Sequence, residues 1–206
     1  MKRWLVVLVS SLMLGSMPLG LALADDSDEQ DGSGQNEIEI LGFVEWIVLD
    51  NPSLRLKARL DTGANTASLH ATDIEEFSRD DEEWVRFDLP LDNHKESDDD
   101  EIEDLIDDAT LTFERPVERT VLIKRKGAES QRRYVVMMDF CINGENHEAQ
   151  FSLTDRGRFS YPALLGRRFM GGQIVVDPAD SFLAESECDY SELEEVAEVA
   201  EEDQPL

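Results

Sequence analysis

A single Asp-Thr-Gly tripeptide, Asp61 to Gly63, constrains the fold of this chain more than any other feature of its sequence. It follows residues 54–60, in which apolar residues recur at every second position, a period that predicts a half-buried β-strand. An acid, a small hydroxyl and a glycine at the end of a strand predict a tight turn, because glycine accepts turn geometry and short polar side chains bond the backbone there. Such a turn directs the Asp61 carboxylate into a cleft, where we expect the Thr62 hydroxyl and backbone N–H groups to hold it.

Strand and turn patterns along the rest of the chain predict an all-β fold. Short apolar runs between turn signals, typical of small β-barrels, lie at residues 37–49, 54–60, 65–71, 84–89, 109–113, 119–124, 133–140, 148–153 and 173–177. Gly42 predicts a bend in the first run, and Asn143-Gly144 predicts a hairpin. Residues 163–170 predict a core strand followed by a short helix that Gly171-Gly172 ends. The expected fold class is a small closed barrel with one short helix near the C-terminal end.

Three acidic segments hold most of the formal net charge of −28. Residues 25–36 contain five acids and no base, residues 92–108 ten acids and one Lys, and residues 185–206 ten acids and no base. Such runs are typical of solvated segments, because they bring too little apolar surface to form a core. We expect a flexible linker at 25–36, an insertion at 92–108 that forms a loop or a short surface helix, and an acidic tail at 185–206. Nucleic-acid binding is disfavoured, because no basic cluster is available to replace phosphate counterions.

The N-terminus has the pattern of a secretory signal peptide. Two basic residues, an apolar run at residues 4–14 and Ala22-Leu23-Ala24 precede the acidic Asp25. This pattern predicts removal of residues 1–24, export and a periplasmic location without a stable membrane anchor. The alternative is an uncleaved N-terminal anchor, for which the apolar run is short.

The chain contains two cysteines, Cys141 and Cys188. In an oxidising compartment they form a disulfide that ties the acidic tail to the body, or they stay separate thiols. Their positions in the sequence do not decide between these two alternatives, because the sequence does not give the distance between them.

Three motifs and their order resemble those of retroviral-type aspartic proteases. Residues 57–64 end in Asp-Thr-Gly-Ala, residues 164–167 are Leu-Leu-Gly-Arg and residues 176–178 are Val-Asp-Pro. A polar hairpin tip around Gly127 and the Asn143-Gly144 hairpin lie between them. Over residues 37–184 the chain looks similar to the bacterial retropepsin-like family often labelled ATP-dependent zinc proteases. The resemblance implies a retropepsin-type barrel that hydrolyses bonds in a peptide or protein substrate.

The resemblance also implies roles for residues at these motifs. It makes Asp61 the catalytic residue and gives supporting, packing and flap roles to three further groups. These are the catalytic-loop residues Thr62, Gly63 and Ala64, the residues packed behind that loop, Leu164, Leu165 and Gly166, and the flap residues Lys126, Gly127 and Ala128. Aspartic proteolysis uses two carboxylates that share one proton across a bound water. Because the chain has a single Asp-Thr/Ser-Gly, activity requires a homodimer in which the Asp61 residues of two chains face each other.

The zinc and ATP of the family label find no support in these residues. A zinc protease of the His-Glu-x-x-His type needs a second His, which residues 147–151 lack, and no Gly-x-x-x-x-Gly-Lys-Ser/Thr loop is present. We therefore expect no metal and no cofactor. Two alternatives stay open: a non-catalytic periplasmic module that binds peptides or a partner protein, with Asp61 as a structural turn residue, and, more remotely, a metal-dependent hydrolase using His70, His94 and His147.

Overall fold

The computed structural model describes residues 38–91, 109–124, 127, 129–193 and 195–197. The expected signal peptide, the linker at 25–36, the acidic insertion at 92–108 and residues 198–206 of the tail lie outside the described residues, as do Lys126 and Ala128. Within the described ranges, no helix has the length and apolar character needed to cross a membrane.

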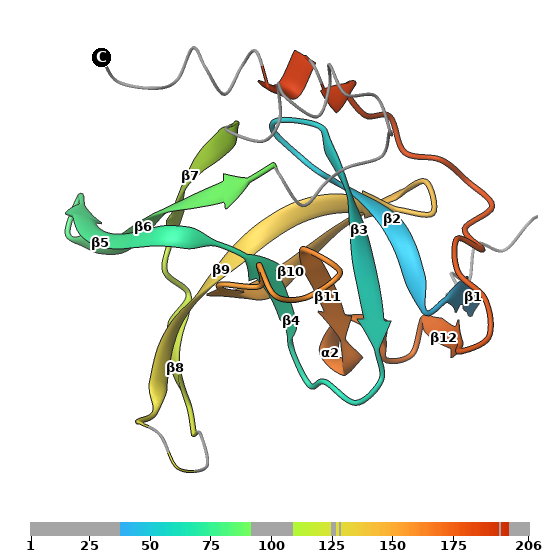
Figure 1. The fold of residues 1–206 in the computed structure, drawn as a ribbon, viewed down its shortest axis with the longest axis horizontal. Coiled ribbons are helices and arrows are strands. Elements are labelled where there is room, and N and C mark those ends of the chain that lie inside the picture. Colours follow the sequence, from blue (N-terminus) through green and yellow to red (C-terminus); the bar gives the residue numbers. More distant parts are fainter. Residues whose placement is uncertain (1–37, 92–108, 125–126, 128, 194, 198–206) are drawn as a thin grey trace, which may run out of the picture. The chain divides into compact units, whose positions relative to one another are not determined.

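The described residues form an all-β fold with the short helix α2 near its C-terminal end, which confirms the predicted fold class (Figure 1). The strands are β1 (Glu39–Gly42), β2 (Val44–Leu49), β3 (Leu54–Asp61), β4 (Ala67–His70), β5 (Thr72–Arg79), β6 (Glu82–Pro90), β7 (Thr110–Pro116), β8 (Arg119–Ile123), β9 (Gln131–Ile142), β10 (Glu145–Thr154), β11 (Ala163–Gly166) and β12 (Ile174–Asp177). Helix α2 spans Arg167–Met170, directly before the two glycines predicted to end it.

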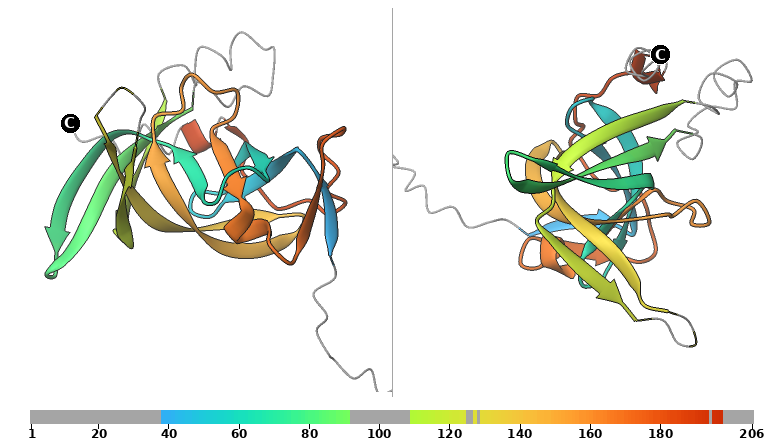
Figure 2. Two further views of the ribbon diagram at one scale, coloured as in Figure 1. Left: turned by 90° about the horizontal axis from the view of Figure 1, so that it is seen from below. Right: turned by 90° about the vertical axis from the view of Figure 1, so that its left-hand side faces the viewer.

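Strands β10, β4, β11, β3, β2 and β9 follow one another in this order and form a barrel, which closes because β9 also pairs with β10. Strand β8 extends the sheet by pairing with β9. Strands β5, β6 and β7 form a separate antiparallel sheet, and β1 pairs with β12 in a parallel two-stranded sheet. The β5–β6 and β8–β9 hairpins both project from the barrel and point in different directions (Figure 1, Figure 2).

Strand β3 appears close to its predicted bounds because its side chains alternate in burial. Leu54, Leu56, Ala58 and Leu60 are buried, whereas the residues between them are partly or fully exposed. Each fully buried leucine stabilises the fold by about 1.5–3 kcal/mol. Because β2 pairs with one edge of β3 and β11 with the other, the barrel fixes the place at which the chain leaves β3, and Asp61 is the strand's last residue.

The predicted hairpin and bend are both confirmed. Asn143 and Gly144 have φ angles of 51° and 77° between β9 and β10, the positive values that a two-residue hairpin turn needs. At Gly42 a Cβ atom would lie 2.6 Å from the Cα of Ser181. Glycine at this bend therefore lets two segments of backbone touch, and the Phe43 N–H donates to the Asp180 carbonyl at 2.9 Å.

Strand β5 was missed in the sequence, because its residues are half or fully exposed and show no clear alternation in polarity. Its pairing with β6 holds it in place instead of a buried face. A turn signal follows the strand, since Asp80 and Asp81 both have positive φ angles, of 52° and 66°. Two consecutive aspartates tolerate this conformation better than most residues, so this pair was the available sign of a β5–β6 hairpin.

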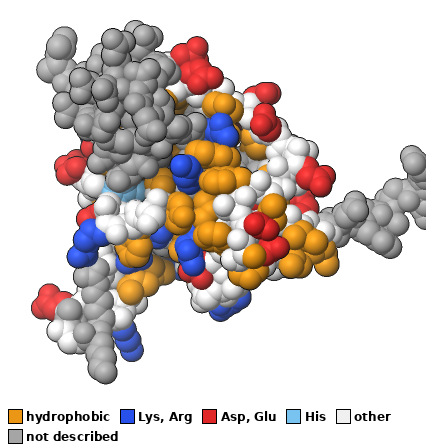
Figure 3. Space-filling view, turned by 45° about the vertical axis from the view of Figure 1, so that its right-hand side comes forward, with side chains coloured by type: hydrophobic (Ala, Val, Ile, Leu, Met, Phe, Trp, Pro, Cys, Tyr) orange, Lys and Arg blue, Asp and Glu red, His pale blue; other side chains and the backbone are white. Residues whose placement is uncertain are grey.

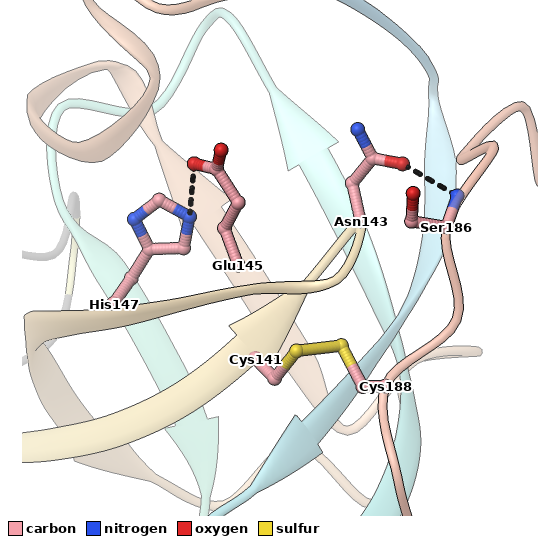
Figure 4. The surroundings of a disulfide bond; sticks show 6 residues. All are labelled: Cys141, Asn143, Glu145, His147, Ser186 and Cys188. Carbon is pink, nitrogen blue, oxygen red and sulfur yellow. Dashed lines mark hydrogen bonds and ion pairs between the residues drawn. A yellow bond between two sulfur atoms is a disulfide. The ribbon is translucent and has the colours of Figure 1, made fainter.

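The segment 180–193, which we term the C-terminal strap, is tied to the barrel by a disulfide between Cys141 and Cys188 (Figure 4). Beside the disulfide, the Ser186 N–H donates to the Asn143 side-chain oxygen at 3.0 Å. Beyond the strap, Val196 and Ala197 are 1% and 0% exposed and join the hydrophobic core. The expectation of a solvated acidic tail is therefore wrong for these two residues, whose small apolar side chains pack inside.

A buried carboxylate secures the other end of the strap. Glu45 on β2 is fully buried and accepts backbone N–H bonds from Gly42 at 2.6 Å, Leu183 at 2.8 Å and Ala184 at 3.4 Å. Buried polar oxygens need such donors, because an unpaired polar group is costly in a medium of low polarity. Glu45 therefore links the bend after β1 to the start of the strap.

Candidate active site

The half-buried Asp61 forms a tight turn with the residues that follow it. Its Oδ1 accepts the backbone N–H of Gly63 at 2.8 Å and of Ala64 at 3.3 Å, and its backbone carbonyl accepts the Ala64 N–H at 3.1 Å. Among the described contacts, the Thr62 hydroxyl makes no hydrogen bond to Asp61. The expected backbone support is thus present, whereas the expected hydroxyl support is not.

Gly63 keeps the Asp61 carboxylate within reach of these donors. A Cβ atom at Gly63 would lie 3.0 Å from Asp61 Oδ1, too close for an ordinary contact. Two N–H donors on one oxygen fix the direction of the carboxylate and leave its Oδ2 available to other partners. Residues 62 and 63 are exposed, so this turn faces solvent on one side.

The sequence placed Leu164, Leu165 and Gly166 behind the catalytic loop, and β11 carries them along β3. In this parallel pairing Leu165 lies opposite Leu60, and Gly166 opposite Asp61. At Gly166 a Cβ atom would lie 2.7 Å from the backbone carbon and oxygen of Thr66. Glycine therefore allows the two ends of the catalytic loop to close around β11.

Arg167 is a functional candidate to which the sequence assigned no role. Its Nη1 donates to the carbonyl oxygens of Thr62 at 2.8 Å and Gly63 at 2.9 Å, and its backbone N–H donates to the Ala64 carbonyl at 3.0 Å. The guanidinium thus binds the outside of the turn whose inside is bound by Asp61. A basic residue directly after Leu-Leu-Gly was the sign that could have identified it.

Arg156 is a second candidate without a sequence-based role. It is 7% exposed, and its Nε donates to the Tyr161 carbonyl at 3.1 Å and its Nη1 to the Ser68 hydroxyl at 2.8 Å. Burial lowers the pKa of Arg156, the nearby Arg133 lowers it further, and Asp61 opposes both effects.

A cavity of about 450 Å³ lies beside the start of β9, and the residues that line it do not include those of the Asp61 turn. It lies between the end of β4, the start of β9 and the end of β10, and Thr72, Arg133 and Asp155 are among its lining residues. Its lining is mixed, with charged side chains of both signs beside the apolar Ile74 and Leu153.

Of the three predicted flap residues, the structure describes Gly127. It is exposed, has a φ angle of 80°, and has no atom within 4 Å of the position of a Cβ. The strands on either side, β8 and β9, pair from Arg119–Val135 to Ile123–Gln131. A hairpin therefore exists where the flap was expected, and the role of its tip stays a prediction.

The described histidines take part in packing and hydrogen bonding. The Nδ1 of the buried His70 accepts the backbone N–H of Arg156 at 2.8 Å. The His147 ring packs 5.2 Å from the ring of Phe169 and 5.9 Å from that of Phe140. Within the described ranges, no group of three or more His, Cys, Asp or Glu residues is arranged to hold a metal ion.

The turn in one chain presents a single carboxylate, whereas aspartic proteolysis needs two. One carboxylate can accept a proton from water, but a second, protonated carboxyl is needed to polarise the peptide carbonyl at the same time. The loop supplies an oriented carboxylate, an exposed face and a supporting arginine. It has the parts that a second, symmetry-related loop would complete.

Comparison with known proteins supports the predicted family. Residues 40–187 match the family model described as retropepsin-like aspartic endopeptidase RimB, which confirms the resemblance drawn from the motifs. A Legionella pneumophila protein of unknown function (DUF785) has a solved structure that is similar, with a TM-score of 0.57 and 31% identity over 71% of this chain and 98% of that one.

Curated relatives bear a different name. A "probable alpha-L-glutamate ligase" of Shewanella pealeana is 35% identical over 147 residues, and one of Desulfotalea psychrophila is 33% identical over 144 residues. The matches cover 69% and 68% of this chain but 29% and 28% of those proteins. The chain therefore spans less than a third of the length of these relatives.

Proposed function

Since the chain belongs to the RimB-like family of retropepsin-like aspartic endopeptidases, we propose that it is an exported endopeptidase whose active form is a homodimer. In this dimer a water between two Asp61 carboxylates attacks the peptide carbonyl. The observation that carries the proposal is the Asp61 turn, in which one carboxylate oxygen is held by two backbone N–H groups at the end of a central strand.

In the proposed mechanism, the two Asp61 residues of the dimer have different roles. One Asp61 is ionised and takes a proton from the water, while the other is protonated and donates a hydrogen bond to the carbonyl oxygen of the substrate. Two carboxyl groups that contact the same water cannot both ionise easily, so they titrate as a unit. Gly63 and Gly166 permit the loop geometry, and Arg167 holds the loop carbonyls in place.

A surface suited to dimer formation lies on the small β1–β12 sheet. Ile38, Ile40 and Val175 expose 59%, 65% and 51% of their area, although all three are large apolar residues. Hydrophobic side chains are visible between basic ones on one face of the described core (Figure 3). In the part of the chain that the structure describes, neither β1 nor β12 has a strand on its outer side. Open edges and exposed apolar side chains favour association with another copy.

Export is part of the proposal. The signal-peptide pattern predicts it, and the Cys141–Cys188 disulfide suits an oxidising compartment. Cell fractionation and the mass of the mature protein test it, with a chain that begins at Asp25 in the periplasmic fraction as the expected result.

The name of the curated relatives is not carried over as an activity. The Shewanella pealeana protein is named a probable ligase, and this chain covers 29% of its length. The Asp-Thr-Gly motif of this chain lies within the residues that match the peptidase family. The name does suggest glutamate-containing peptides as a first set of substrates to test, alongside an unbiased peptide library.

The decisive experiment replaces Asp61. Asp61→Asn removes the titrating group but keeps the size of the side chain and an acceptor oxygen for the Gly63 N–H. We expect loss of peptide cleavage together with an unchanged thermal unfolding midpoint. Asp50→Asn is the matched control, since Asp50 is exposed in the turn at the other end of β3.

Cleavage by the Asp61→Asn protein at the wild-type rate would disprove the proposal. Sedimentation of the wild type adds a second test, because a strict monomer at working concentration would leave each Asp61 alone. That result would favour a non-catalytic module that binds peptides or a partner protein.

A further inference from the structure

Four polar side chains connect the β5–β6 hairpin to the first half of β9. Glu76 lies on β5, Glu83 on β6, and Arg132 and Tyr134 on β9. The two hairpins point in different directions (Figure 1), but side chains of the first contact side chains of β9. We call these four residues the hairpin latch.

The contacts in the latch converge on Glu76 and Arg132. The Tyr134 hydroxyl donates to Glu76 Oε2 at 2.5 Å, and Arg132 Nη2 lies 3.3 Å from the same oxygen. Arg132 Nη2 also donates to Glu83 Oε1 at 3.4 Å, and the Arg132 guanidinium carbon lies 4.8 Å from the centre of the Tyr134 ring. One arginine thus pairs with both strands of the neighbouring hairpin and stacks on the tyrosine of its own strand.

The electrostatics agree with this geometry. The hydrogen bond to Glu76, together with burial, raises the pKa of the Tyr134 hydroxyl above its ordinary value. The Arg132, Glu76 and Glu83 side chains are 52%, 42% and 44% exposed, so water weakens each ion pair. The latch is therefore suited to setting the position of a hairpin and adds little to the stability of the whole fold.

The position of the latch on β9 gives it a consequence for the active site. Tyr134 and Arg132 pair across the hairpin with Thr120 and Leu122 of β8. The other half of β9 belongs to the barrel and pairs with β2 and β10. The latch residues of β5 and β6 thus contact β9 at the point where this strand leaves the barrel and becomes one strand of the β8–β9 hairpin.

We propose that Glu76, Glu83, Arg132 and Tyr134 are positioning residues, which hold the β8–β9 hairpin at the angle that substrate binding beside Asp61 requires. The proposal rests on the proposed peptidase function, in which this hairpin covers the substrate. It gives the β5–β6 hairpin a defined task as a support for the substrate-binding hairpin.

Two measurements on the full dimeric enzyme test the latch. Glu76→Gln and Tyr134→Phe should each raise KM by about two- to fivefold, the effect of losing one or two exposed polar pairs, with a smaller change in kcat. Hydrogen exchange at the amides of Thr120 and Leu122 should become faster in both variants. Arg132→Gln should behave in the same way, whereas Arg132→Lys keeps the charge and should restore most of the wild-type KM.

Glu75→Gln is the matched control, because it removes an exposed acid from the same strand without touching the latch. Unchanged hydrogen exchange in β8, or equal effects of the Glu75 and Glu76 variants, would overturn the proposal. The exchange measurement needs no catalysis. If the wild-type protein cleaved no peptide, the peptidase function would fail while the latch would still be tested.

Discussion

The disulfide between Cys141 and Cys188 supports a quantitative prediction about stability. The two residues are separated by 47 positions, so the bond closes a loop of this size in the unfolded chain. The loop-closure relation gives an entropy loss that corresponds to about 4 kcal/mol at room temperature. Measured values for single disulfides are mostly about 2–4 kcal/mol. The free energy of unfolding of the double variant Cys141→Ala, Cys188→Ala should therefore be about 2–4 kcal/mol below that of the wild type.

Urea unfolding of the oxidised wild type and the double variant measures the difference. The slope of the free energy against urea should rise in the variant, because an unfolded chain without the cross-link exposes more surface. Apart from the loss of the disulfide's own signal, near-UV circular dichroism should stay unchanged, since Glu45 and Asn143 still bind the strap. Ser186→Ala is a suitable control, because the strap uses the backbone N–H of this residue and not its hydroxyl.

A loss below about 1 kcal/mol, well under the range for single disulfides, would refute the reasoning. It would mean that the unfolded chain already keeps the strap close to β9, or that the native bond carries strain equal to its entropic benefit. A large loss accompanied by an altered near-UV spectrum would instead mean that the disulfide shapes the native strap, so that loop closure is not the main effect.

Two further predictions concern the catalytic loop and the β5–β6–β7 sheet. Gly166→Ala should destabilise the fold by about 1–3 kcal/mol, because its Cβ would meet the Thr66 backbone, and should also reduce cleavage; an unchanged unfolding midpoint would contradict it. Hydrogen bonds from Arg79 and Arg86 lower the pKa of Glu114 from its ordinary value of 4.5. The stability that Glu114 contributes is therefore fully present above its pKa in the unfolded chain, and it is lost as the pH falls through its lower pKa in the folded protein. In urea titrations, wild type should therefore exceed Glu114→Gln in stability at neutral pH and lose that advantage as the pH falls below the ordinary pKa of glutamate and through the lowered pKa of Glu114; a difference independent of pH would contradict this.

Local patterns predicted the elements whose side chains alternate or whose turns need special residues. Strand β3 was predictable from its apolar period, and the β9–β10 hairpin from Asn143-Gly144. Strand β5 lacks the alternation, because cross-strand pairing holds it rather than a buried face, and its sign in the sequence was the Asp80-Asp81 turn that follows it. The burial of Val196 and Ala197 was hidden for a similar reason, since these two small apolar residues stand among many acids.

In the candidate site, too, local features were predictable and long-range contacts were not. The carboxylate and its glycine follow from three adjacent residues, so the sequence was sufficient to locate them. The roles of Arg167 and Arg156 depend on strands that bring residues about a hundred positions apart into contact, as the bond between Arg167 and Thr62 shows. A single sequence contains no sign of which carbonyl an arginine will reach.

The closed barrel also bears on how a second chain could complete the site. Because β9 pairs with β10, the six barrel strands have no open edge, and within the described residues β1 and β12 stand outside it as a separate sheet. Pairing of two such sheets would cover Ile40 and Val175, whose exposure is otherwise unfavourable. It would also leave both barrels intact, so that each Asp61 turn would keep the N–H donors it has in one chain. Polar replacements at these two positions should therefore weaken the proposed dimer and its cleavage together while sparing the fold, whereas a loss of cleavage with the dimer intact would place the partner surface elsewhere.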